Sequence, residues 1–117
     1  MKAAAMKPEI TIEDLEKIDI RVGTIEAVDD VDGSKKLVKL TVNFGDQTRT
    51  ILAGMKNERE DPAEIVGLQA LFVVNLAPRK MAGEVSQGML FDLGYEDGIT
   101  PVLAVPEKPV PPGVRAG

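Results

Sequence analysis

Apolar and polar residues alternate along the first half of the chain, and this pattern constrains the fold more than any other feature. The first apolar positions recur at every second residue: Ile18, Ile20 and Val22. After Gly23 the phase shifts, and the alternation continues at Ile25 and Ala27. A period of two is typical of a strand with one buried face. A glycine at a phase shift indicates a bulge or sharp bend, so we expect one long, bent strand that can serve both halves of a small barrel.

Further strands are expected along the rest of the chain, separated by turn signals at Asp32-Gly33 and Gly45-Asp46. Their expected ranges are Val38–Phe44, Gln47–Ala53, Leu68–Leu76, Met89–Leu93 and Pro101–Val105. The fourth strand of the chain, Leu68–Leu76, is apolar almost throughout, which predicts that both of its faces are covered. We expect Ala77–Gly83 to be a loop and the proline-rich tail Pro106–Gly117 to be extended.

Two short helices complete the expected layout. Thr11 and Asp14 have the spacing of a capping box, which predicts a helix over Ile12–Ile18. Asp61-Pro62 indicates the start of another helix between the third and fourth strands. With 117 residues the chain suits one domain over residues 11–117, preceded by a flexible leader over 1–10. About five strands with one intervening helix are the layout of an all-β OB-fold, a five-stranded Greek-key barrel, although periodicity alone does not separate it from other small barrels.

Two residue types are missing, and their absence excludes much chemistry. The sequence has no His and no Cys. Imidazole acid–base catalysis, thiol nucleophiles, disulfides and ordinary zinc sites are therefore excluded, and we expect no metal and no cofactor. Only Ser34 and Ser86 stand where a nucleophile could be imagined, so an enzyme is the weakest hypothesis. The chain offers no sign of an oxidising compartment and no apolar run that could span a bilayer, so we expect a cytoplasmic protein without a membrane partner.

The charge is segregated along the chain. The net charge is −5, which on its own argues against a nucleic-acid partner. Between Gly33 and Lys56, however, Asp46 is the lone acid among five bases: Lys35, Lys36, Lys39, Arg49 and Lys56. A second basic pair follows Pro78 at Arg79-Lys80. The alternative interpretation is an ordinary solvated surface that carries both signs of charge.

Three short segments carry the functional interpretation. They are Gly33-Ser34-Lys35-Lys36-Leu37, Asn75-Leu76-Ala77-Pro78-Arg79-Lys80-Met81 and Ser86-Gln87-Gly88-Met89. In these segments the chain resembles the tRNA-binding domain found at the C-terminus of bacterial methionyl-tRNA synthetases, in free-standing dimeric tRNA-binding proteins and in CsaA proteins. Asp19–Gly23 and Val110–Gly113 also match, so that the resemblance covers roughly residues 11–115. It implies an OB-fold homodimer that binds tRNA by shape.

Carried over residue by residue, the resemblance implies a set of tRNA-binding positions: Ser34, Lys36, Asn75, Arg79, Lys80, Ser86 and Met89. Lys35 is an addition to the family pattern. Each assignment has an alternative. Asn75 could instead satisfy loop backbone, Ser86 could be a turn residue and Met89 could fill the core, while Arg21 is expected to pair with a nearby acid.

Two functional hypotheses follow. The first is a non-catalytic tRNA-binding protein, either free-standing or a detached synthetase-type domain that acts in trans with an aminoacyl-tRNA synthetase. The second is a chaperone of the CsaA type, which would present the apolar Leu68–Leu76 strand and exposed methionines to unfolded chains. The two-faced strand and the extended tail also predict a homodimer.

Overall fold

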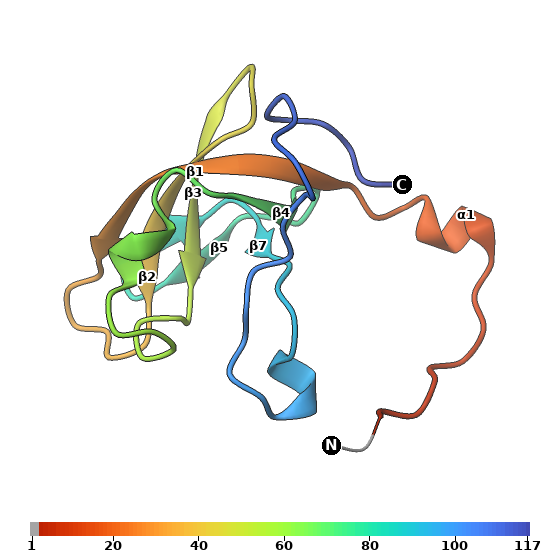
Figure 1. Cartoon of the computed structure of the whole chain (residues 1–117), viewed down its shortest axis with the longest axis horizontal. Coiled ribbons are helices and arrows are strands. Elements are labelled where there is room, and N and C mark those ends of the chain that lie inside the picture. Colours follow the sequence, from red (N-terminus) through yellow and green to blue (C-terminus); the bar gives the residue numbers. More distant parts are fainter. Residues whose placement is uncertain (1–2) are drawn as a thin grey trace.

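The computed structural model describes residues 3–117 and is mostly β-structure (Figure 1). Five strands form one curled sheet in the order β3-β2-β1-β4-β7, and β5 and β6 form a separate hairpin. The elements of the sheet and hairpin are β1 (Ile20–Asp30), β2 (Val38–Asn43), β3 (Thr48–Ala53), β4 (Gln69–Val73), β5 (Arg79–Met81), β6 (Glu84–Ser86) and β7 (Met89–Leu90). The helical elements are α1 (Ile12–Leu15), η1 (Pro62–Ile65) and η2 (Tyr95–Asp97), the last two being 3₁₀ turns. This arrangement confirms the all-β, OB-like prediction.

The long strand β1 crosses the whole body and serves both halves of the sheet (Figure 1). Its first half pairs with β4 and its second half pairs with β2, both antiparallel. The bulge was expected at Gly23 but lies between Ile25 and Ala27, where the register with β2 shifts. Gly23 is required for another reason, because a Cβ there would overlap the side chains of Val42 and Phe44.

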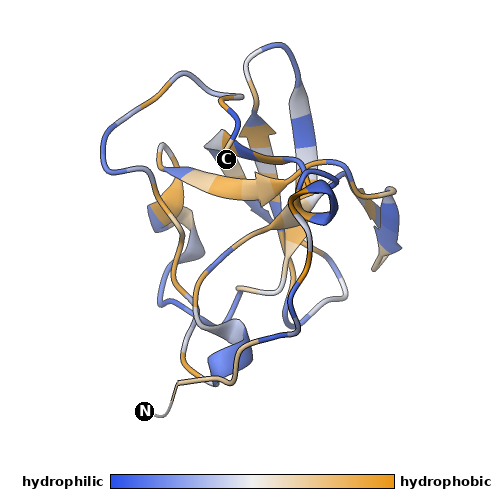
Figure 2. Cartoon of the chain, turned by 90° about the vertical axis from the view of Figure 1, so that its right-hand side faces the viewer, coloured by the Kyte–Doolittle hydropathy of each residue, from blue (hydrophilic) through white to orange (hydrophobic). Residues whose placement is uncertain are grey.

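The core lies inside the curl of the sheet. Phe72, Ile25, Leu40 and Ile51 are completely buried, and Phe44 packs edge-on against Phe72 with 5.5 Å between ring centroids. Hydrophobic residues are concentrated in the strands at the centre of the molecule, whereas the turns are mostly hydrophilic (Figure 2). No helix among residues 3–117 is long and apolar enough to cross a membrane.

Several expected boundaries need correction. The segment expected to be a loop, 77–83, contains β5 and leads into the β5–β6 hairpin. The strand expected over 101–105 is reduced to one bridge between Leu93 and Val102. The N-terminal helix ends at Leu15 and not at Ile18, since a single capped turn buries none of its residues against the body.

The C-terminal tail is extended, as expected, but it lies across its own chain. The backbone N–H of Val22 donates to Val114, the N–H of Gly113 donates to Val22, and the N–H of Ala116 donates to Ile20. The tail therefore covers the start of β1. Residues 3–10 have no helix or strand and are exposed, while Met1 and Lys2 of the expected leader lie outside the described residues.

Candidate nucleic-acid interface

The loop between β1 and β2 presents its two lysines on a fixed backbone. The Oγ of Ser34 accepts a hydrogen bond from the Lys36 N–H at 3.3 Å. Lys56 ties the loop down from the other side, because its Nζ donates to the Ser34 carbonyl and pairs with Asp30. The hydrogen-bonded ion pair between Lys56 and Asp30 lowers the pKa of the Asp30 carboxyl below its ordinary value. Lys35 and Lys36 themselves are exposed.

The β5–β6 hairpin carries the second basic pair. Arg79 and Lys80 are both exposed on β5, directly after Pro78. Arg79 pairs with Ser86 across the hairpin. The Nζ of Lys39 on β2 forms an ion pair with Glu84 of β6 at 3.2 Å, which anchors the hairpin to the sheet. The tip of this hairpin and Asp30–Asp32 border a common hollow, so the two basic segments lie on neighbouring elements.

A second hollow, of about 320 Å³, lies at the base of the hairpin. It brings together three of the seven predicted site residues, namely Arg79, Ser86 and Met89. The other lining residues are Leu52, Leu76, Ala77, Met81 and Gly88. Sequence reasoning did not single out Leu52 or Leu76, because nothing in the local pattern shows that β3 and the end of β4 meet at this hairpin.

Ser86 lies at the floor of this hollow, where only 3% of its surface is exposed. Its Oγ accepts from the Leu52 N–H and donates to the Gly88 carbonyl, both at 3.0 Å. Next to it, the Gln87 N–H donates to the Thr50 carbonyl at 2.8 Å. These bonds join the segment before β7 to β3 and draw the curled sheet together. The hydroxyl of Ser86 thus already has a donor and an acceptor within the protein.

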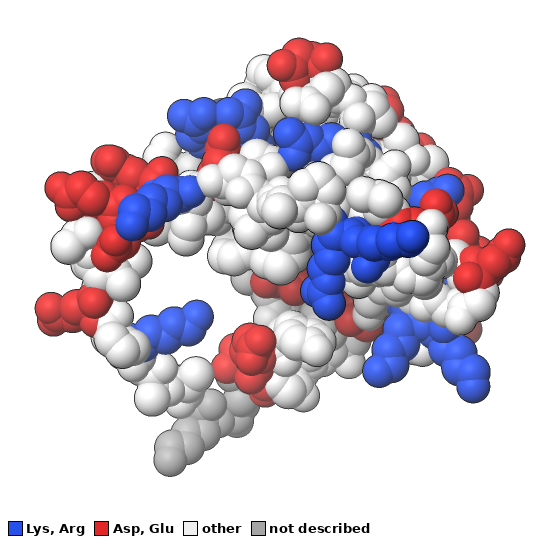
Figure 3. Space-filling model, turned by 180° about the vertical axis from the view of Figure 1, so that it is seen from behind, with Lys and Arg blue, Asp and Glu red and all other residues white. Residues whose placement is uncertain are grey.

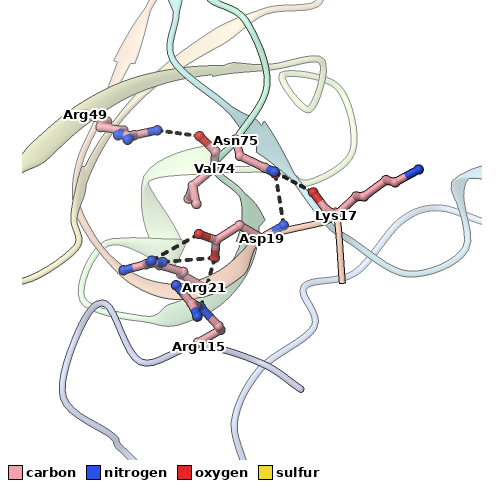
Figure 4. A network of polar contacts seen from close by, with 7 residues as sticks. All are labelled: Lys17, Asp19, Arg21, Arg49, Val74, Asn75 and Arg115. Carbon is pink, nitrogen blue, oxygen red and sulfur yellow. Dashed lines mark hydrogen bonds and ion pairs between the residues drawn. The ribbon is translucent and has the colours of Figure 1, made fainter. Parts of the chain in front are cut away.

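Asn75 lies at the end of β4 and holds the segment that precedes β1 (Figure 4). Its Oδ1 accepts from the Asp19 N–H at 2.9 Å, and its Nδ2 donates to the Lys17 carbonyl at 2.6 Å. Arg49 donates to the neighbouring Val74 carbonyl at 2.7 Å. The side chain of Asn75 therefore satisfies backbone polar groups, which was the alternative interpretation of this residue.

Arg21 is paired with an acid, as predicted (Figure 4). Its Nε and a terminal nitrogen each donate to an Asp19 carboxylate oxygen at 3.0 Å. Arg115 approaches the same carboxylate at 3.5 Å. The hydrogen bonds from Arg21, reinforced by the positive charge of Arg115, hold the pKa of Asp19 below its ordinary value.

The cations of the chain thus divide into two groups. Those in ion pairs within residues 3–117 are Lys17, Arg21, Lys39, Lys56, Arg59 and Arg115. By contrast, Lys35, Lys36, Arg79 and Lys80 form no ion pair with any residue of that range, and the same holds for Lys7, Lys108 and Arg49, of which Arg49 donates to the Val74 carbonyl. On the face shown in Figure 3, basic side chains stand out at several separate places and do not merge into one patch. This arrangement suits contacts to spaced anionic groups.

The fold and this site define a small β-barrel module with unpaired cations on a loop and a hairpin. The chain belongs to the tRNA-binding domain family: residues 20–115 match the family model described as "Putative tRNA binding domain".

Relatives of known sequence include methionine–tRNA ligases. The chain is 40% identical over 114 residues to the enzyme of Acidithiobacillus ferrooxidans, and 42% identical over 108 residues to that of Methanococcoides burtonii. These matches cover 97% and 92% of this chain but only 16% of either ligase. The chain therefore spans about a sixth of the length of these relatives.

Solved structures of the same fold include a MetRS-related protein and two CsaA chaperones. A MetRS-related protein from Pyrococcus horikoshii superposes with a TM-score of 0.86 at 35% identity, covering 95% of this chain and 100% of the other. A CsaA chaperone from Picrophilus torridus gives 0.79 at 30% identity, covering 93% and 100%. The CsaA chaperone from Bacillus anthracis gives 0.80 at 25% identity, covering 94% and 100%.

Proposed function

We propose that this chain is a non-catalytic module that binds folded tRNA through its two basic segments. The observation that carries the proposal is the set of exposed cations Lys35, Lys36, Arg79 and Lys80, which have no ion pair within residues 3–117, whereas six other cations are ion-paired there. Free cations on a fixed backbone are available for phosphates at little entropic cost. Membership of the tRNA-binding family supports tRNA as the nucleic acid.

The predicted site residues divide by role. Lys36, Arg79, Lys80 and Met89 are exposed and are assigned direct contacts. Arg79 can hold a phosphate with two parallel hydrogen bonds, while a lysine acts as a point charge. Ser34, Asn75 and Ser86 are assigned a positioning role, because their side chains hydrogen-bond the protein's own backbone.

Composition supports folded RNA as the ligand over single strands. Aromatic residues make up only 3% of the chain, so there is no row of rings on which successive bases could stack. Shape-reading through phosphates and sugars needs no such platform. With about 3–5 phosphate contacts per subunit, the affinity should be modest and steeply salt-dependent.

The experiment that tests this function is fluorescence anisotropy with bulk tRNA and with an unstructured RNA of equal length, at low and at physiological salt. We expect preference for tRNA and a steep loss of affinity with salt. Absence of tRNA binding at low salt would contradict the proposal.

We also propose that the module acts as a homodimer. The segment around α1 exposes Ile10, Ile12, Leu15 and Ile18, and α1 buries none of its residues. The segment after β7 exposes a second apolar group: Phe91, Leu93, Tyr95, Ile99, Val102 and Val105. Figure 3 shows open space between the N-terminal segment and the body. A one-turn helix is unstable without packing, so a second copy is the partner that this apolar surface suits.

Sedimentation equilibrium at micromolar concentration tests the dimer. Leu15→Glu and Leu93→Glu should each convert it to a monomer, because a charge at a buried contact is costly. Val85→Glu is the matched control, since Val85 on β6 is similarly exposed but lies outside both apolar groups. A wild-type monomer would refute this part of the proposal.

The partner enzyme that we propose is an aminoacyl-tRNA synthetase in the cytoplasm, because the relatives of known sequence include methionine–tRNA ligases. The module would raise the affinity of the synthetase for tRNA without entering the chemistry. Two sites in a dimer would add to this effect. Addition of the module in trans should lower the KM for tRNA and leave kcat unchanged.

A chaperone function is the second candidate, and the similarity to two CsaA chaperones favours it. The identity to the two methionine–tRNA ligases, 40% and 42%, is nevertheless higher than the 25% and 30% to the two CsaA chaperones. Suppression of aggregation of a test protein, unaffected by added tRNA, would support the chaperone. Lack of suppression at a stoichiometric dose would count against it.

A further inference from the structure

We propose that the hollow at the base of the β5–β6 hairpin receives one unstacked nucleobase of the bound RNA. This inference rests on the proposed function and adds a subsite to it. The hollow has a volume of about 320 Å³, at the small end of the range of about 300–1,000 Å³ for ligand sites. It therefore suits a single planar ring system.

The hollow has a buried floor and an exposed, partly apolar rim. Leu52 and Ser86 are buried at the floor, with 5% and 3% of their surfaces exposed. Leu76 and Met89 are each 47% exposed at the rim. Large aliphatic and thioether side chains left half in water gain favourable contact when a flat apolar face covers them. A base that leaves its stack in a tRNA loop supplies such a face.

Arg79 lines the same hollow and connects it to the phosphate-binding function. Its guanidinium is unpaired within residues 3–117 and can stack on the plane of a base or hold the adjoining phosphate. Lys80 follows it directly with a second unpaired charge. The charge at the rim favours an anionic ligand with an apolar ring over an apolar peptide side chain.

The polar groups around the hollow predict weak discrimination between bases. The Ser86 hydroxyl is already used by Leu52 and Gly88, so the floor offers no free side-chain hydrogen bond. The backbone N–H groups of Leu76 and Ala77 donate to no other residue of 3–117, and they are left to pair with acceptors on any base edge. A pocket of this kind binds a displaced base without distinguishing one base from another.

The test is a methyl NMR titration of the intact protein with adenosine 5′-monophosphate, uridine 5′-monophosphate and ribose 5-phosphate. Both nucleotides should shift the methyl signals of Leu76 and Met89 at millimolar concentration, whereas ribose 5-phosphate, which has the charge but no base, should not. Equal shifts with ribose 5-phosphate, or no shifts with nucleotides, would overturn the inference. Shifts produced by an unfolded test protein and not by nucleotides would overturn it in favour of a peptide site.

Variants link the pocket to tRNA. Leu76→Gln should weaken tRNA binding about five- to tenfold, in the range for losing one base contact, and should abolish the nucleotide-induced shift of the Met89 methyl signal. Val85→Gln, a similarly exposed control on β6, should change the affinity less than twofold. Thermal unfolding confirms that each variant folds, and Leu76→Ala provides a milder substitute.

If tRNA binds in a salt-dependent way but Leu76→Gln binds as the wild type does, the pocket fails while the proposed function stands. If nucleotides shift the methyl signals of Leu76 and Met89 but tRNA does not bind, the proposed function fails while the pocket stands.

Discussion

Asn75 and Arg79 are four positions apart in the sequence, yet their surroundings differ in kind. Around Asn75, the polar side chains are engaged within the chain: the Asn75 amide holds Asp19 and Lys17, and Asp19 in turn holds Arg21. Around Arg79, the guanidinium and the neighbouring Lys80 have no ion-pair partner within residues 3–117. The first region uses its polarity to build the fold, and the second leaves it available for a ligand. Substitutions in the two regions should therefore separate stability from binding.

The largest expected effect is on tRNA affinity. Arg79→Ala combined with Lys80→Ala should weaken tRNA binding at low salt by about 10- to 100-fold, because two phosphate contacts are lost. The melting temperature should change little, since neither side chain has an ion pair to lose. Anisotropy and thermal unfolding measure the two quantities. Lys7→Ala combined with Lys108→Ala removes the same charge from exposed lysines elsewhere and should leave most of the affinity. A large loss of stability in the first variant would instead make Arg79 structural.

Asn75→Ala should show the opposite pattern. It leaves the Asp19 N–H and the Lys17 carbonyl without their present partner, at a cost of about 1 kcal/mol in the free energy of unfolding because water can reach this site. For a domain of this size we expect the melting temperature to fall by about 3–6 °C. The tRNA affinity, measured well below that temperature, should stay within about threefold. Unchanged stability with lost affinity would show that Asn75 contacts RNA directly.

The ion pairs of Asp19 with Arg21 and Arg115 should make the free energy of unfolding depend on pH in the acid range. The pKa of Asp19 is lowered in the folded state, so its contribution to stability is present above its ordinary pKa of 3.8 and is lost as the pH falls through the lowered value. Asp19→Asn should therefore destabilise the protein at pH 7 and flatten the acid limb of the stability profile below about pH 4. Urea denaturation at a series of pH values measures this. If the stability of Asp19→Asn falls as steeply below pH 4 as that of the wild type, the pH dependence comes from other carboxylates.

The smallest expected effect concerns the turn of the β5–β6 hairpin. Ala82 has a φ of 49°, the left-handed region that favours glycine, and Gly83 follows with 80°. Ala82→Gly should stabilise the protein by up to about 1 kcal/mol, because glycine adopts a left-handed φ without the steric strain caused by the Cβ of alanine. Gly83→Ala is the matched opposite and should destabilise it, although nothing lies within 4 Å of the added Cβ. Melting temperatures that move in the same direction in both variants would contradict this reasoning.

The contrast between the two regions also shows how far the sequence alone can lead. Alternation over β1 and β2 predicted the sheet, because half-buried strands leave a period-two pattern. The β5–β6 hairpin was missed, since strands of three residues are too short to show a period and Ala82 gives no turn signal. A basic pair after Pro78 was recognisable as a candidate contact because exposed charge needs no knowledge of distant residues.

The roles of Asn75 and Ser86 could not be predicted in the same way. Asn and Ser bind ligands and satisfy backbone groups with the same atoms. The partner of Asn75 is 56 positions away at Asp19, and that of Ser86 is 34 positions away at Leu52. Only the folded chain shows that these groups are occupied. The hollow between Leu52, Leu76 and Met89 depends on three separate strands or strand ends and is equally invisible in the sequence.

The central claim is that Arg79 and Lys80 are phosphate contacts, and the salt dependence of tRNA binding tests it most directly. The logarithm of the association constant should be plotted against the logarithm of salt concentration for the wild type and for the Arg79→Ala, Lys80→Ala double variant. The account predicts that the slope of the variant is shallower by about 1.4–1.8, since each of the two lost phosphate contacts removes roughly 0.7–0.9. Equal slopes for the two proteins would contradict the claim, whatever the affinities.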